Sequence, residues 1–113
     1  MANRQVDLVQ GTLEMLILKA LARGKPMHGF GVARWIEDVT DDRLSVEEGA
    51  LYPALHRMRR RGWVEAEWGI SENNRRARYY RITRKGRNQF QRAVASWQSS
   101  TAAVAAVLQA ERG

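Results

Sequence analysis

Cysteine is absent from this 113-residue sequence, which excludes disulfide scaffolds, thiol nucleophiles and cysteine-ligated metal sites. Proline occurs only twice, and aromatic residues make up 8% of the chain. No long apolar run is present, because Glu14 and Lys19 interrupt the stretch 13–21, which is also too short to span a bilayer. The first residues include Asp7, whereas a secretory signal peptide needs a basic start and a clean apolar run. We therefore expect a cytoplasmic protein of one domain's length with no membrane contact.

A catalytic or metal-binding set is also missing. The two histidines, His28 and His56, fall on different predicted helices and have no triad partner, and two histidines without cysteine make a poor zinc site. Gly29 and Gly31 do not form a phosphate loop, because no strand precedes them and no Lys-Ser or Lys-Thr follows. We expect no enzyme activity, no metal and no cofactor. His28 is predicted to begin a helix and His56 to lie on the surface.

Positive charge is abundant and concentrated in one third of the chain. The sequence has 19 Lys and Arg against 12 Asp and Glu, a net charge of +7. Residues 57–92 contain twelve basic and three acidic residues, whereas residues 1–56 carry a net −2 and residues 93–113 are neutral. A block of this kind favours a polyanionic partner over a merely solvated face.

Apolar periodicity predicts three short helices. Residues 12–23 and 29–39 each repeat apolar side chains at helical spacing. For the third helix, Ser45 and Glu48 have the spacing of a capping box, and Gly62 is a stop signal.

The period then changes from helical to alternating. Residues 64–68 alternate with Val64, Ala66 and Trp68 on one face, and residues 78–82 form a second β-rich run with Tyr80 in the core. Residues 69–77 form the loop between them, and Thr83 is a candidate N-cap for a final helix. The fold is predicted to be mainly α with a small β-hairpin: a winged helix-turn-helix domain over residues 1–83 and a long C-terminal dimerisation helix over residues 84–113.

The third helix has the layout of a DNA-recognition helix. One face is apolar and buried, and the other begins with small, uncharged residues that permit close approach to a groove floor. Arginines follow one to two turns later, where phosphates would flank the groove. The hairpin tip adds arginines and asparagines, which suit phosphates, narrow minor grooves and tight turns. The predicted DNA-binding residues are Gly49, Ala50, Tyr52, Pro53, His56, Arg57, Arg60, Asn73, Asn74, Arg75, Arg76 and Arg78.

The last helix carries an a/d heptad seam that is too apolar for an isolated helix. We expect it to hold a homodimer through Phe90, Val94, Trp97, Thr101, Val104 and Leu108. A two-fold axis near Trp97 would bring two indoles together, with small neighbours at Ala93, Thr101 and Ala103. Paired indoles could bind a planar aromatic ligand by stacking, or Trp97 could simply fill the interface core.

Several runs of residues together resemble a known family. Residues 51–55 read Leu-Tyr-Pro-Ala-Leu and residues 79–83 read Tyr-Tyr-Arg-Ile-Thr, with His-Gly-Phe-Gly at 28–31 and Gly-Trp at 62–63. These runs resemble the PadR family of bacterial transcriptional regulators, and the single C-terminal helix resembles its short subgroup. The resemblance implies a dimeric repressor that binds a palindromic operator in double-stranded DNA and is released by a small ligand or another cue. It also implies that Tyr52 contacts the DNA backbone.

Two other functions are compatible with these features. The basic block alone also fits a non-specific architectural protein that binds nucleic acid. A protein-interaction module could instead use the heptad helix, in which case the chain would not bind nucleic acid at physiological salt.

Overall fold

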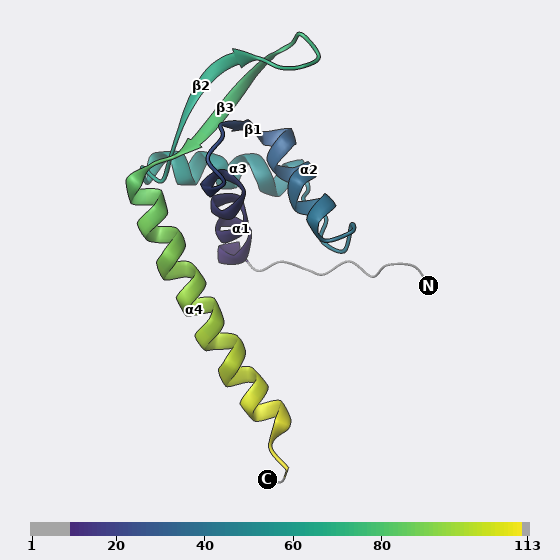
Figure 1. Cartoon of the computed structure of the whole chain (residues 1–113), viewed down its shortest axis with the longest axis vertical. Coiled ribbons are helices and arrows are strands. Elements are labelled where there is room, and N and C mark those ends of the chain that lie inside the picture. The colour runs from purple at the N-terminus through teal and green to yellow at the C-terminus, as the bar shows by residue number, and fades with distance from the viewer. Residues whose placement is uncertain (1–9, 112–113) are drawn as a thin grey trace.

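The computed structural model describes residues 10–111 and confirms the predicted fold class. The order of elements is α1 (Gln10–Ala22), β1 (Met27–His28), α2 (Gly29–Val39), α3 (Glu48–Arg60), β2 (Val64–Ile70), β3 (Arg76–Ile82) and α4 (Arg84–Gln109). The first three helices pack together, the β2–β3 hairpin projects from them, and α4 extends well beyond the rest of the molecule (Figure 1). Residues 1–9, at the start of the predicted winged-helix domain, and residues 112–113, at the end of the predicted C-terminal helix, lie outside the described residues.

The core forms where the apolar stripes of the three helices meet the base of the hairpin. Its largest fully buried side chains are Ile17, Leu18, Leu21, Val32, Ile36, Leu51, Leu55, Met58 and Val64. Burial of such side chains stabilises a fold by about 1.5–3 kcal/mol each, before chain entropy is counted. No helix among residues 10–111 is long and apolar enough to cross a membrane.

Helix α2 begins where the sequence predicted it. His28 is the N-cap, and its Nδ1 accepts a hydrogen bond from the Gly31 backbone N–H at 2.9 Å. Gly29, the first helical residue, is buried, and a Cβ there would lie 2.6 Å from the ring of Tyr52 on α3. This glycine therefore allows α2 and α3 to approach closely.

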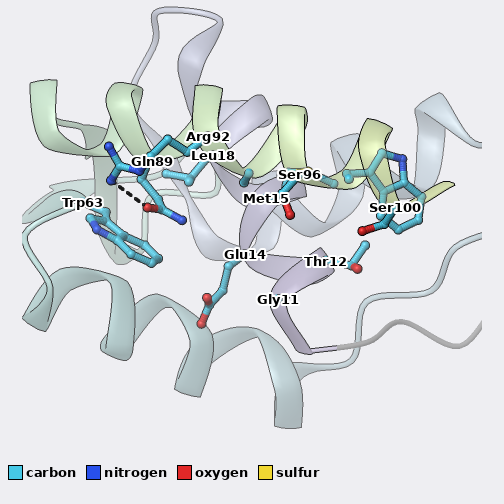
Figure 2. A pocket seen from close by; sticks show the side chains of 12 residues that line it. Gly11, Thr12, Glu14, Met15, Leu18, Trp63, Gln89, Arg92, Ser96 and Ser100 are labelled. Atoms are coloured by element: carbon cyan, nitrogen blue, oxygen red, sulfur yellow. Dashed lines mark hydrogen bonds between the residues drawn. The ribbon is translucent and has the colours of Figure 1, made fainter. Parts of the chain in front are cut away.

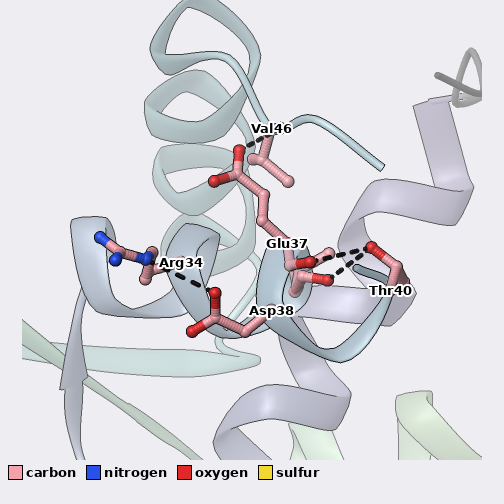
Figure 3. Close-up of polar contacts among 6 residues, drawn as sticks. Arg34, Glu37, Asp38, Thr40 and Val46 are labelled. Atoms are coloured by element: carbon pink, nitrogen blue, oxygen red, sulfur yellow. Dashed lines mark hydrogen bonds and ion pairs between the residues drawn. The ribbon is translucent and has the colours of Figure 1, made fainter. Parts of the chain in front are cut away.

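The predicted capping box at the start of α3 is wrong. The N-cap is Glu47 and makes no side-chain hydrogen bond, so the helix begins after Ser45 and without its help. The connection is held from the end of α2 instead: the Val46 N–H donates to Glu37 Oε2 at 3.0 Å (Figure 3), and the Leu44 N–H donates to the Thr40 hydroxyl oxygen at 3.2 Å. These bonds fix residues 44–46 ahead of α3.

The sheet has one strand more than predicted. The hairpin is confirmed, with Val64 paired to Ile82 and Ile70 to Arg76. On its other edge, β3 pairs with β1 through residues Met27 and His28, which gives the order β1-β3-β2. The short β1 strand ties the start of α2 to the hairpin, and it directly precedes Gly29, where the sequence was expected to have no strand.

Thr83 caps α4 as predicted. Its Oγ1 accepts from the Gly86 N–H at 3.0 Å and lies within hydrogen-bonding distance of the carbonyls of Gly62 and Trp63. Gly86 packs directly on the Trp63 backbone, where a Cβ would clash. These contacts fix the direction in which α4 leaves the domain. At roughly 1.5 Å per residue, its 26 residues extend about 39 Å.

Candidate nucleic-acid interface

The outer face of α3 is open, as the sequence predicted. Leu51, Ala54, Leu55 and Met58 are buried, whereas Gly49, Ala50, Pro53, His56 and Arg60 are exposed. A Cβ built at Gly49 would meet nothing within 4 Å. Gly49 and Ala50 therefore present two small, uncharged positions in the first turn of α3, next to the exposed carboxylates of Glu47 and Glu48, and the arginines come later on the helix.

Arg57 does not lie free on this face. Its Nε donates to Glu14 Oε2 on α1 at 3.0 Å, and Arg61 approaches the other carboxylate oxygen at 3.7 Å. Glu14 is only 8% exposed and is the one buried charged residue among those described. A buried carboxylate is costly unless a cation compensates it, so Glu14 holds the Arg57 side chain against α1. The predicted placement of Arg57 on the open face is thus corrected, and its role in DNA binding stays a prediction.

Tyr52 lies where α3 meets α2. Its ring packs on Gly29, and its side chain is half-exposed. Burial raises the pKa of the Tyr52 phenol above its usual value near 10, and the negative charge of Glu48 raises it further. Tyr52 therefore remains a neutral hydroxyl at physiological pH, able to donate a hydrogen bond to an anionic acceptor.

The β2–β3 hairpin corresponds to the predicted wing, and its tip, residues 71–75, is a tight, polar loop. The Ser71 N–H donates to the Arg75 carbonyl at 2.8 Å, and the Asn74 N–H donates to the Ser71 carbonyl at 2.9 Å. Asn74 has a φ of 60°, a left-handed conformation that asparagine tolerates better than most residues. Asn73, Asn74, Arg75 and Arg76 are exposed, and Arg78 is half-buried. The predicted wing residues therefore lie together at and beside one loop.

A cleft of about 450 Å³ joins the wing to the start of α2 and to α3. It brings together three predicted DNA-binding residues, Tyr52, Arg76 and Arg78. None of its lining residues is acidic; they are His28, Gly29, Phe30, Tyr52, Trp68, Arg76, Ala77, Arg78 and Tyr80. A cationic cleft between a helix and a wing suits a nucleic-acid strand.

Trp68 and Phe30 line this cleft, and sequence reasoning missed both as functional residues. Alternation placed Trp68 on the same face as Val64, which is buried, but Trp68 is 56% exposed because β2 continues past the core. Arg76 and Arg78 lie over its indole, with guanidinium carbons 4.4 and 5.3 Å from the ring centroid. Glu14 was missed as well, although an acidic residue between apolar neighbours on α1 was a usable signal.

The predicted dimer seam on α4 divides into two parts. Phe90 packs against the core of its own chain and Val94 is half-buried, so this end of the seam serves the monomer. Further along, Trp97, Val104 and Leu108 are 46%, 57% and 78% exposed. Thr101 is also exposed, and its hydroxyl donates to the Trp97 carbonyl at 3.0 Å.

A second cavity, of about 540 Å³, lies between α1 and α4 (Figure 2). Trp97 lines this cavity. Of the three small residues predicted beside Trp97, Ala93 lines the cavity as well, whereas Thr101 and Ala103 do not. The remaining lining residues are Gly11, Thr12, Glu14, Met15, Leu18, Trp63, Gln89, Arg92, Ser96 and Ser100. The volume is in the range of small-molecule sites.

Comparison with known proteins agrees with this architecture. Residues 17–92, more than half of the chain, match the family model described as the transcriptional regulator PadR-like family. A transcriptional regulator from Clostridium thermocellum is 26% identical, with a TM-score of 0.78 over 88% of this chain and 95% of that one. A PadR-like transcriptional regulator from Bacillus cereus is 28% identical, with a TM-score of 0.73 over 90% and 96%. A PadR family regulator from Eggerthella lenta is 26% identical, with a TM-score of 0.77 over 90% and 86%.

Proposed function

Because the chain belongs to the PadR-like family of DNA-binding transcriptional regulators, which are not enzymes, we propose that it is a homodimeric repressor that reads a palindromic operator. The observation that carries the proposal is that Tyr52 of α3 lines one cleft together with Arg76 and Arg78 of the wing, and that no acidic residue lines that cleft. α3 enters the major groove, and the wing holds the adjoining backbone.

The two elements have different tasks. Gly49 and Ala50 let α3 approach the base edges closely, so the first turns of α3 carry the sequence preference. Arg60, Arg75 and Arg76 are exposed cations and bind phosphates, which supplies affinity without sequence information.

Dimerisation occurs through the outer part of α4. Val104 and Leu108 would otherwise leave apolar side chains in water, and their burial against a second copy is worth about 1.5–3 kcal/mol each. A two-fold dimer presents two copies of α3, which is the symmetry that a palindromic site requires.

The cavity lined by Trp97 is the proposed effector site. An indole stacks on planar aromatic molecules, and the cavity also borders α1, which packs on α3. A planar aromatic ligand bound there would act on the regulator through the dimer helix and α1.

Selection from a random duplex library tests the proposal. The full chain should enrich a palindromic sequence and bind it far more tightly than random duplex at about 0.15 M salt, since specific sites exceed non-specific ones by roughly 10³-fold or more. Enrichment of no sequence, with tight binding to all duplexes, would indicate the non-specific architectural protein instead. A chain that binds no duplex would act as a protein-interaction module.

A further inference from the structure

Trp68 is a large, exposed aromatic residue on a strand face whose base is buried. Val64, on the same face at the base of β2, is 2% exposed, whereas Trp68 and the next residue on that face, Ile70, are 56% and 63% exposed. A large indole beyond the edge of the core contributes little to packing and exposes apolar surface. Its contacts therefore indicate what else it does.

Those contacts are two guanidinium groups. Trp68 pairs directly with Arg78 across the hairpin, and Arg76 lies two residues away on the same face of β3. Their guanidinium carbons are 5.3 and 4.4 Å from the indole centroid, both within the range of a cation–π interaction. One ring thus restrains two arginines at once.

Arg76 and Arg78 are held differently from Arg81, which lies on the opposite face of the hairpin. There, Arg81 is bound by Glu65 at 3.0 Å, and the carboxylate cancels its charge. Arg76 and Arg78 make no ion pair within residues 10–111, and the buried Nε of Arg78 has no hydrogen-bond partner there. A guanidinium stacked by its face keeps its full charge, and N–H groups at its edge remain available to an acceptor.

We propose that Trp68 is a positioning residue that orders Arg76 and Arg78 for binding to the DNA backbone. The ring limits the freedom of two flexible side chains before DNA arrives, so less conformational entropy is lost on binding. Both arginines line the cleft shared with Tyr52, so the ordered groups already lie between the wing and α3. The inference rests on the proposed function, because it assigns a partner to the wing.

The first test compares affinities of the full chain for one mixed-sequence duplex, since phosphate contacts do not require an operator. Trp68→Leu should bind about fivefold more weakly, as expected from the loss of exposed cation–π contacts. Trp68→Tyr keeps an aromatic face and should recover most of the affinity. The matched control, Ile70→Ala, removes an equally exposed apolar residue from the same strand face and should bind like the original chain.

A double-mutant cycle separates positioning from direct contact. In a chain carrying Arg76→Ala and Arg78→Ala, Trp68→Leu should cause no further loss of affinity, because the indole acts through these two side chains. An undiminished loss in that background would show that the indole itself touches DNA and would overturn the proposal. Equal affinities of the original chain and Trp68→Leu would also overturn it, whereas a failure of the original chain to bind duplex would refute the proposed function.

A measurement on the free protein tests whether the indole of Trp68 stacks on Arg76 and Arg78 before DNA is bound. In the free protein, the side-chain NMR signals of Arg76 and Arg78 should be shifted by the indole ring current and should move to ordinary values in Trp68→Leu. Unshifted signals in the original chain would contradict the stacked arrangement.

Discussion

The ion pair between Glu14 and Arg57 ties α1 to α3, and its removal should have a measurable cost. Truncation of one partner of a buried pair typically destabilises a protein by about 3–5 kcal/mol, because an uncompensated charge stays buried. Here the Arg57 side chain is 31% exposed and Arg61 remains 3.7 Å from the carboxylate, so water and the second arginine offset part of that cost. We expect Arg57→Ala to lower the free energy of unfolding by about 2 kcal/mol.

Urea denaturation at fixed protein concentration measures this quantity, since a dimer's stability depends on concentration. Arg61→Ala is the matched control: its side chain is 54% exposed and its contact is longer, so the loss should be below about 0.5 kcal/mol. The combination of Glu14→Leu with Arg57→Met replaces the pair by apolar groups and should recover stability to within about 1 kcal/mol of the original chain. An Arg57→Ala variant as stable as Arg61→Ala would refute the assignment of Arg57 to a buried pair.

Three further predictions concern the dimer, the effector cavity and Tyr52. Val104→Asp combined with Leu108→Asp should give a monomer in sedimentation without loss of helix content, because both residues are exposed in one chain; a dimer that persists would place the interface elsewhere. Titration of DNA-free protein with aminoacridine should quench tryptophan emission, and Trp97→Phe should lower the quenching, the remainder coming from Trp63 in the same cavity; quenching that survives unchanged would exclude Trp97. Because the pKa of Tyr52 is raised in the folded chain, its contribution to stability is present below about pH 10 and declines above it. Thermal melts should therefore show a steeper alkaline loss in the original chain than in Tyr52→Phe, and parallel losses would contradict the raised pKa.

Local signals in the sequence predicted most of the fold. The bounds of α2 and the N-caps at His28 and Thr83 follow from periodicity and side chains within three residues of the cap, so the sequence alone indicates them. The β1 strand has only two residues and exists through its pairing with β3, which no local pattern shows. The true start of α3 likewise depends on Glu37, which holds Val46 from the preceding helix.

In the candidate site, too, local sequence signals predicted some features, whereas others depend on contacts between distant parts of the chain. The open α3 face follows from helical periodicity, and the exposed loop follows from its composition. The partner of Arg57 is 43 residues away in the sequence, so its turn toward α1 required the packed structure. Alternation placed Trp68 on the same strand face as Val64, but its exposure depends on how far the core extends beneath β2.

The central claim is that α3 reads sequence while the wing supplies affinity, and one comparison tests it most directly. The measured quantity is the ratio of affinities for the selected palindromic duplex and for random duplex, in Ala50→Leu and in Arg76→Ala. Arg76→Ala should weaken both complexes by similar factors and leave the ratio unchanged, because phosphate contacts carry no sequence information. Ala50→Leu should lower the ratio by about tenfold or more, since the larger side chain holds α3 away from the groove floor. Equal effects of the two variants on the ratio would contradict the account.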